Sequence, residues 1–342
     1  MSQKVTISTV AAHARVSRQT VSNVLNAPHI VREETRLRVQ EAITELGYRA
    51  NQAARQMRTG RSRLIAVRIE PTRDGINGSV LDRFLHGLTE TAESAGYRVM
   101  LYTATDAHQE IDAFDDLLGA YDLDAFVLTG TERGDPRTAW LAGRDVPFVT
   151  FGRPWDAPDP HPWVDVDNAA GTAQATRHLL ATGHRRIGYI GWPLPISAVG
   201  GERRSGWHET LREAGVDPGG LDRETVDGIA EGERTMRELL AAAEPPTAVV
   251  CASDSLALGA LQAVRGSAAY APPAGPPTPG GPVAVVGFDD TPVAAAVGLT
   301  SVSQPLGVAA ARCVDLLTGV LDGQPVDSPV LLQPSLVRRQ TA

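Results

Sequence analysis

The chain is poor in cysteine and contains no long apolar run. Only two of its 342 residues are cysteines, Cys251 and Cys313, and they form no CxxC or mixed Cys/His spacing. A disulfide framework, a structural zinc site or another cofactor is therefore not expected. No stretch of about 18 apolar residues predicts a membrane-spanning helix. No apolar segment near the N-terminus precedes a small-residue cleavage site, so the sequence predicts a cytoplasmic location without membrane contact.

Motifs that carry common enzyme chemistry are also missing. No GxGxxG follows the first predicted strand, and the chain has no GxSxG, HExxH or Walker motif. The sequence is therefore not expected to encode an enzyme. Two alternatives stay open at this stage. An α/β enzyme would show activity in the C-terminal body, and a secreted sugar-binding module would need a leader and no basic N-terminal segment.

Charge is divided unevenly along the chain. The formal net charge is −8, from 32 Lys and Arg against 40 Asp and Glu. Residues 1–63 hold eleven basic and four acidic residues, a net charge of +7, which leaves −15 for residues 64–342. Such a split predicts a small polyanion-binding head, associated with the nucleoid, on an acidic body with another task.

The basic segment predicts three short helices. Thr6 and Ser17 can cap the first two, over residues 7–14 and 18–25. The third is expected over 33–46, ending at Gly47. In the second helix, the apolar residues expected to face inward are Val21, Val24 and Leu25.

The first two helices and their tight turn predict a helix-turn-helix. In that motif the first residues of the second helix reach base edges in the major groove. The residues expected to read bases are Arg18, Gln19, Ser22 and Asn23, because Arg pairs with guanine and Gln or Asn with adenine. The residues expected to cap helices or contact phosphates are Thr6, Ser17, Thr20 and Asn26.

The acidic body alternates short apolar runs with helical stretches. This alternation predicts an α/β fold with parallel sheets, and the number of strands favours two lobes. The expected strands cover residues 64–69, 99–102, 125–129, 148–151, 187–191, 248–252 and 283–288. The expected helices cover residues 79–95, 108–119, 168–182, 201–214, 231–243 and 254–265.

Several motifs resemble the LacI/GalR family of bacterial transcriptional regulators. In the head these are Val5-Thr-Ile-x-x-Val-Ala, Val16-Ser-x-x-Thr-Val-Ser-x-Val-Leu-Asn26, Thr35-Arg-x-x-Val, Leu46-Gly-Tyr48 and Asn51-x-x-Ala-Arg. In the body they include Val164-Asp-Val-Asp-Asn168, Arg203-x-x-Gly-Trp207, Ala252-Ser-Asp-Ser and Val286-Gly-Phe-Asp-Asp290. The resemblance covers nearly the whole chain.

The resemblance implies a domain order and a mode of DNA binding. It implies a helix-turn-helix headpiece (1–50), a hinge helix (51–63) and a periplasmic-binding-protein-like body (64–342). The N-lobe would cover about 64–164 and 306–333, and the C-lobe about 165–305 and 334–342. A homodimer would bind a near-palindromic operator in double-stranded DNA and act as a repressor. Its hinge helices would enter the minor groove through Ala53, Ala54 and Met57, and Arg55 would contact phosphates.

The resemblance also implies a small-molecule effector between the lobes. The expected effector-binding residues are Arg203, Asp289, Ser253, Trp192 and Phe84. An arginine fork and a carboxylate hold sugar hydroxyls, and aromatic rings pack on the C–H faces of sugars. A sugar is the favoured effector, and a purine-like corepressor is the alternative.

Three further expectations concern side chains near the cleft. Asp254 is expected to cap the helix over 255–264 rather than touch the effector. Asp227 or its neighbours stand where some family members have a cleft tryptophan. Trp155, Trp163 and Trp192 are all expected in loops after strands or near the lobe crossing, with Trp192 the best candidate for stacking.

Overall fold

A computed structural model describes residues 5–48, 60–69, 76–156, 161–193, 197–267 and 281–342. The chain divides into two compact units, Met1–Ser62 and Arg63–Ala342. The first unit contains the headpiece and nearly all of the segment predicted as the hinge, and the second unit is the body.

The headpiece is a small helical unit whose helices begin and end at local signals. Its elements are α1 (Ile7–His13), α2 (Arg18–Asn26), the 3-10 turn η1 (Pro28–Ile30) and α3 (Glu33–Leu46). Thr6 caps α1 in a capping box with Thr9, and Ser17 caps α2 by accepting from the backbone N–H of Thr20 (3.0 Å). Gly47 ends α3 in the left-handed region, where glycine costs least.

The headpiece core is formed by one apolar face from each helix. It contains Val10 and Ala11 of α1, Val21 and Val24 of α2, and Val39 of α3. The prediction that Leu25 faces inward is wrong, because 36% of this residue is exposed. Leu25 follows Val24 by 100° on the helix, which turns it away from the buried stripe.

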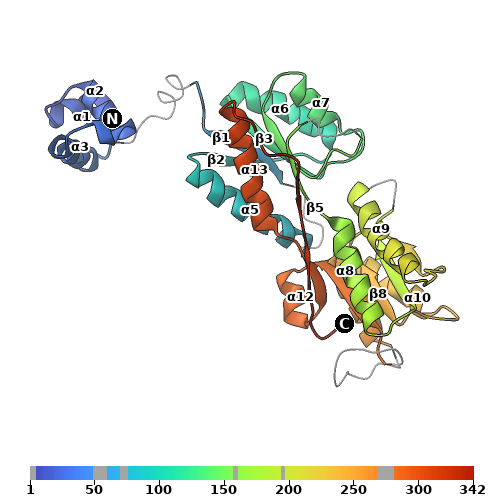
Figure 1. Cartoon of the computed structure of the whole chain (residues 1–342). Helices are drawn as coiled ribbons and strands as arrows, with labels where there is room; N and C mark the ends of the chain where they lie inside the picture. Colours follow the sequence, from blue (N-terminus) through green and yellow to red (C-terminus); the bar gives the residue numbers. More distant parts are fainter. Residues whose placement is uncertain (1–4, 49–59, 70–75, 157–160, 194–196, 268–280) are drawn as a thin grey trace. The chain divides into compact units, whose positions relative to one another are not determined.

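The body consists of two α/β lobes, each built on a six-stranded sheet (Figure 1). The N-lobe sheet has the order β11-β5-β4-β3-β1-β2, and all its pairings are parallel. Its strands are β1 (Leu64–Ile69), β2 (Arg98–Thr103), β3 (Ala125–Thr129), β4 (Phe148–Phe151), β5 (Trp163–Val166) and β11 (Val330–Leu332). Its helices are α5 (Ile76–Ser94), α6 (Ala107–Tyr121), α7 (Pro136–Ala142) and α13 (Leu306–Leu321).

The C-lobe sheet has the order β12-β10-β9-β8-β6-β7 and is parallel except for β12, which pairs antiparallel with β10. Its strands are β6 (Ile187–Gly191), β7 (Asp222–Glu224), β8 (Ala248–Cys251), β9 (Ala284–Asp289), β10 (Thr300–Ser303) and β12 (Ser335–Val337). Its helices are α8 (Asn168–Ala181), α9 (Ala198–Glu213), α10 (Ile229–Leu240), α11 (Asp254–Arg265) and α12 (Pro292–Val297).

The chain passes between the two sheets where α8 follows β5, where α13 follows β10, and where β12 follows β11. The C-terminal segment therefore contributes to both lobes, and α13 packs on α5 in the N-lobe although it follows a C-lobe strand. The carboxyl ends of parallel strands are where α/β sheets bind ligands, so the loops after these strands position the candidate site.

Several elements of the body were not predicted from the sequence. These are the strands β5, β7, β10, β11 and β12 and the helices α7, α12 and α13. Because β5 begins at Trp163, the expectation that this tryptophan lies in a loop is wrong; it is a mostly buried strand residue.

None of the helices in the described segments combines the length and the apolar character that a membrane crossing requires. In those same segments, no group of three or more His, Cys, Asp or Glu side chains is arranged to hold a metal ion.

Candidate functional site

The start of α2 presents the predicted base-reading face of the headpiece. Arg18 and Gln19 are exposed at the first turn, directly after the Ser17 cap, while Val21 is fully buried behind them. Ser22 and Asn23 are half-buried one turn later. The Gln19 amide donates to Asn23 Oδ1 (2.9 Å), which holds these two amide side chains side by side. The four residues therefore share a surface with donors and acceptors suited to base edges.

In the described part of the headpiece, the hydroxyl groups predicted to cap helices or contact phosphates lie within hydrogen-bonding distance of groups in the same helix turn. The Thr6 side chain accepts from the Thr9 backbone, and the hydroxyls of Ser17 and Thr20 lie 2.9 Å apart. Asn26 is the last residue of α2. Arg55 and the hinge residues Ala53, Ala54 and Met57 lie outside the described residues, so their predicted roles stay predictions.

In the C-lobe, polar side chains gather after successive strands of the sheet. Trp192 follows β6, Asp227 lies beyond β7, Ser253 lies just after β8, Asp289 ends β9 and Gln304 follows β10. These positions are the carboxyl ends of neighbouring parallel strands. The order of the strands in the sheet therefore brings the five residues to one edge.

Arg203 lies at the centre of this edge and is almost completely buried. From α9, its Nε donates to Asn168 Oδ1 (2.9 Å) and one Nη donates to the carbonyl of Ala252. The same Nη lies 3.6 Å from Asp289 Oδ1, and the guanidinium carbon lies 3.7 Å from the centre of the Phe288 ring. A buried guanidinium with partners on several sides is fixed in one orientation, as recognition of adjacent ligand oxygens requires.

Asp289 is a buried acidic residue with a positive backbone φ angle. Its φ is 113°, and its carboxylate accepts from the Gln304 amide (2.7 Å). Burial raises the pKa of Asp289 well above its ordinary range; the nearby Asp254 and Asp227 act in the same direction, while Arg203 and Gln304 oppose it. A carboxylate held partly desolvated beside an arginine is a strong acceptor for ligand hydroxyls.

The capping role predicted for Asp254 belongs to Ser253. The Ser253 hydroxyl accepts from the Leu256 backbone N–H (3.2 Å) and donates to Asp227, and the residue is 1% exposed. Asp254 is instead the first residue of α11. Its buried carboxylate accepts from the backbone and hydroxyl of Thr291 (2.7 and 2.8 Å) and from the Ser301 hydroxyl (2.6 Å). Asp254 therefore links the start of α11, after β8, to Thr291 in the segment after β9 and to Ser301 in β10.

The two predicted stacking residues differ in their placement. Trp192 is half-buried beside the Arg203 guanidinium, 5.3 Å from its carbon, and its buried indole N–H has no hydrogen-bond partner within the described part of the chain. Phe84 is 1% exposed in the N-lobe core, where it stacks on Phe151 with 4.6 Å between ring centres. This packing leaves Phe84 no surface for a ligand, so the structure contradicts an effector contact for it.

Three residues that the sequence did not single out complete the site. Asn168 and Gln304 orient Arg203 and Asp289, and Asn168 could have been noticed as the polar end of the Val164–Asn168 motif. Arg83 of α5 could not have been identified from the sequence. Its guanidinium donates to the backbone carbonyls of Asp289, Asp290 and Gln304 (3.3, 2.9 and 3.0 Å), linking the N-lobe to the C-lobe beside the site.

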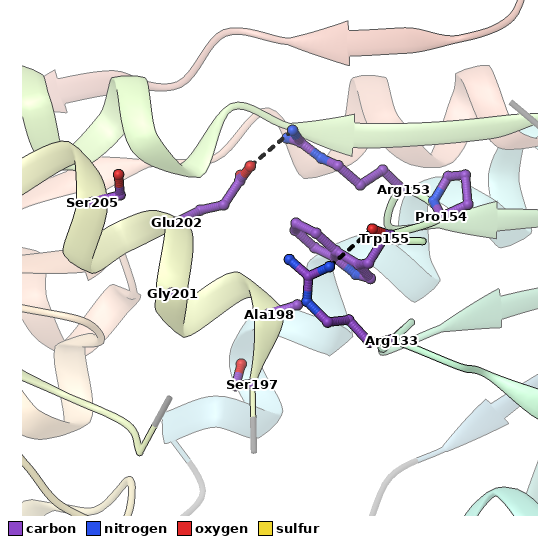
Figure 2. A pocket seen from close by; sticks show the side chains of 9 residues that line it. All are labelled: Arg133, Arg153, Pro154, Trp155, Ser197, Ala198, Gly201, Glu202 and Ser205. Carbon is purple, nitrogen blue, oxygen red and sulfur yellow. Dashed lines mark hydrogen bonds and ion pairs between the residues drawn. The ribbon is translucent and has the colours of Figure 1, made fainter. Parts of the chain in front are cut away.

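A cavity of about 370 Å³ lies between the loops of the N-lobe and α9 (Figure 2). The loops contribute Arg133, Arg153 and Trp155, and the helix contributes Ser197, Glu202 and Ser205 among others. Arg153 spans the two lobes, because its Nε donates to Asp165 (2.6 Å) and its Nη1 donates to Glu202 (2.9 Å). This volume falls within the range of small-molecule sites, about 300–1,000 Å³.

A helix-turn-helix head joined to a two-lobe body with a polar site at the strand ends defines a ligand-responsive transcriptional regulator. Residues 6–51 match the family model described as bacterial regulatory proteins, lacI family. Residues 176–342 match the periplasmic binding protein-like domain. The chain belongs to the LacI family of transcriptional regulators.

Individual relatives extend over the whole chain. The HTH-type transcriptional regulator CelR of Thermobifida fusca is 34% identical over 96% of this chain and 94% of its own length. A solved structure of a CelR–cellobiose complex has a TM-score of 0.73 and 31% identity, covering 99% of this chain and 100% of the other. The lac repressor dimer bound to operator and the anti-inducer ONPF has a TM-score of 0.80 and 28% identity, covering 99% of both chains.

Proposed function

We propose that this regulator is a homodimeric repressor that binds a near-palindromic operator and is controlled by a sugar. The observation that carries the proposal is the buried Arg203–Asp289 pair at the carboxyl edge of the C-lobe sheet, flanked by Trp192. It is an arrangement for holding a neutral ligand rich in hydroxyls. The similarity to a dimeric lac repressor on its operator and to a cellobiose-binding regulator supports both halves of the proposal.

On the DNA side, the headpiece (1–50) places α2 in the major groove. Arg18, Gln19, Ser22 and Asn23 read base edges, and the phosphate contacts fix the register without reading the sequence. The hinge segment (51–63) enters the minor groove, where Met57 is the apolar wedge. Since residues 1–63, which hold the headpiece and the hinge segment, carry +7 and the rest of the chain −15, the duplex is attracted to this N-terminal part and repelled by the body.

On the effector side, adjacent hydroxyls of one sugar ring accept from Arg203 and donate to Asp289. The indole N–H of Trp192, which has no hydrogen-bond partner among the described residues, supplies a further donor, and its ring supplies an apolar face. The net charge of Arg203, Asp289 and Asp227 favours a ligand without negative charge. Ser253 contributes by fixing Asp227 rather than by offering a free hydroxyl.

Control follows from linkage between the two ligands. Arg83 joins α5 of the N-lobe to the backbone of Asp289, so a ligand that moves Asp289 acts on the lobe to which the hinge is attached. An effector that favours one lobe arrangement shifts operator affinity by no more than its own difference in affinity for the two arrangements. The regulator acts where the chromosome is, in the cytoplasm at the nucleoid.

Footprinting of the full-length protein on the DNA upstream of its own and neighbouring genes tests the proposal. We expect one protected near-palindromic site, an affinity that falls steeply with salt, and release by a member of a sugar panel. A reporter under that site should rise when the gene is deleted. Absence of a specific site would contradict the DNA half of the proposal, and release by nucleobases but not sugars would contradict the effector half.

A further inference from the structure

Among the described residues, two arginines of the N-lobe reach across to the C-lobe. Arg83 bonds to backbone carbonyls beside the candidate site, and those carbonyls are present whatever side chains accompany them. Arg153, in the loop after β4, bonds instead to a side chain. Its Nη1 donates to Oε1 of Glu202 on α9 (2.9 Å), as a dashed line in Figure 2 shows. This second contact is an ion pair, so a single substitution can remove it.

Arg153 is fixed to the N-lobe by several contacts. Its Nε donates to Asp165 of β5 (2.6 Å), whose side chain is 6% exposed. Its carbonyl accepts from the Thr131 hydroxyl (3.0 Å), and its guanidinium carbon lies 5.2 Å from the centre of the Trp155 ring. A guanidinium with partners in its own lobe keeps its orientation when the other lobe moves, so the N-lobe holds Arg153 as a fixed group.

The polar contacts of this loop continue to β1, the strand that follows the predicted hinge segment. The carbonyl of Gly130, directly before the threonine that bonds to the Arg153 loop, accepts from Arg137 (3.0 Å). Arg137 also donates to Glu110 (2.8 Å), which is completely buried and pairs with Arg68 of β1 (2.9 Å). These buried, paired charges connect the Arg153 loop firmly to β1.

Glu202 is the partner that can separate from the pair. Its side chain is 25% exposed, and its second oxygen, Oε2, is buried without a partner in the described part of the chain. Burial raises the pKa of Glu202, and Arg153 opposes this shift. The nearby Asp165 and Asp167 act on the pKa in the same direction as burial. The carboxylate therefore gains hydration when it leaves Arg153, which offsets much of the attraction that it loses. Such a pair can form in one lobe arrangement and open in another.

We propose that the Arg153–Glu202 pair is a latch that holds the two lobes in their effector-free arrangement and sets how readily an effector shifts them. The inference rests on the proposed function in one respect, that the effector-free arrangement is the one that binds the operator. Without the latch, the effector-free arrangement is less populated. An effector that selects the other arrangement then binds more tightly.

The distance between the lobes tests the latch directly. Asp116 of α6 and Ala241, just after α10, are exposed positions in different lobes, and Asp116→Cys with Ala241→Cys provides sites for two spin labels. Both native cysteines are buried, so they can stay. Pulsed EPR on the full-length protein without ligand gives the distance distribution. Labelled protein is mixed with an excess of unlabelled protein, so that each assembly carries one labelled subunit.

Glu202→Gln keeps the shape of the side chain and removes its charge. We expect a second population of distances, at least three times as abundant as in the protein without this substitution. Glu202→Lys places a like charge opposite Arg153 and should move the distribution further in the same direction. Calorimetry with the sugar that releases the operator should show an affinity at least threefold higher in Glu202→Gln.

Asp156→Asn is the matched control, because Asp156 pairs with Arg133 of the same lobe (3.5 Å). It should change neither the distances nor the affinity for sugar. The latch is overturned if both Glu202 variants keep the original distances, or if Asp156→Asn changes them equally. Changed distances with an unchanged sugar affinity would contradict the claim that the latch sets the response. If the distances change as expected but no sugar releases the operator, the latch stands and the proposed function fails.

Discussion

Replacing Arg203 by alanine removes the residue that the proposed effector site depends on most. Among the described residues, the side chain makes two hydrogen bonds, one ion pair and two ring contacts, with Phe288 and Trp192, while only 5% of the residue is exposed. Removing one member of a buried ion pair costs about 3–5 kcal/mol when the other charge stays unpaired. Asp289 can avoid that penalty by taking up a proton, because burial already raises its pKa.

We therefore expect Arg203→Ala to destabilise the body at neutral pH by less than the full penalty, on the order of 1–3 kcal/mol, which is the usual cost of an unsatisfied buried polar group. The loss should grow at higher pH, where Asp289 must ionise without its partner. The double variant Arg203→Ala, Asp289→Asn should recover part of this loss, since it removes the unpaired charge. Urea denaturation at several pH values measures the stability lost in Arg203→Ala, the growth of that loss with pH, and its recovery in the double variant.

The effect on the response to the effector distinguishes Arg203 from an arginine that only stabilises the fold. Arg203→Ala should abolish the effector response and leave operator binding intact, because the headpiece is a separate compact unit. Arg204→Ala is the matched control, since Arg204 is the next residue of α9, more exposed, and paired with Asp222 instead. Operator titrations with and without the sugar give the result. A normal sugar response in the Arg203→Ala variant would refute the assignment of the cleft.

Three further predictions concern other parts of the chain. Arg18→Ala should weaken operator binding by about 1–3 kcal/mol and relax the preference at one base position, as fluorescence anisotropy on single-base operator variants would show. Gly206→Ala should destabilise the body by about 1–3 kcal/mol or more in urea denaturation, because the added carbon would lie 2.1 Å from the Ala169 carbonyl oxygen where α9 crosses α8. Burial raises the pKa of Asp254 to about 6, so the stability it contributes is fully present below its ordinary pKa of 3.8 and is lost as the pH rises through about 6. Unfolding free energies measured across that range should fall with pH, and Asp254→Asn should flatten the slope.

The headpiece was predictable because its signals are local. Thr6, Ser17 and Gly47 act within one helical turn, so their roles in starting and ending helices can be inferred from the sequence alone. Leu25 shows the limit of the method. Its apolar character suggested burial, but its place beside Val24 on the helix turns it toward the surface.

The body was predictable where strands are long and apolar. The strand β3, with five buried residues, gave a clear signal, whereas β7 and β11 have three residues each and are edge strands with exposed positions. The adjacent Ser253 and Asp254 are both good capping residues, and only the tertiary partners of Asp254 decide between them.

The sequence could predict which residues belong to the candidate site, but not which side chains pair with one another. Arg203 and Asp289 could be named from the sequence, yet the Arg153–Glu202 pair joins residues 49 positions apart across two lobes. Phe84 shows the reverse error, since the stacking on Phe151 that buries it is a tertiary contact with no local signature.

In the proposed function, a sugar bound at the body and an operator bound at the headpiece act on one equilibrium. The most direct measurement is a pair of titrations on the full-length protein: operator affinity with and without saturating sugar, and sugar affinity with and without saturating operator. If the two ligands are coupled, both affinities change by the same factor, as linkage requires. Operator affinity that is unchanged by a sugar bound at Arg203 would contradict the account.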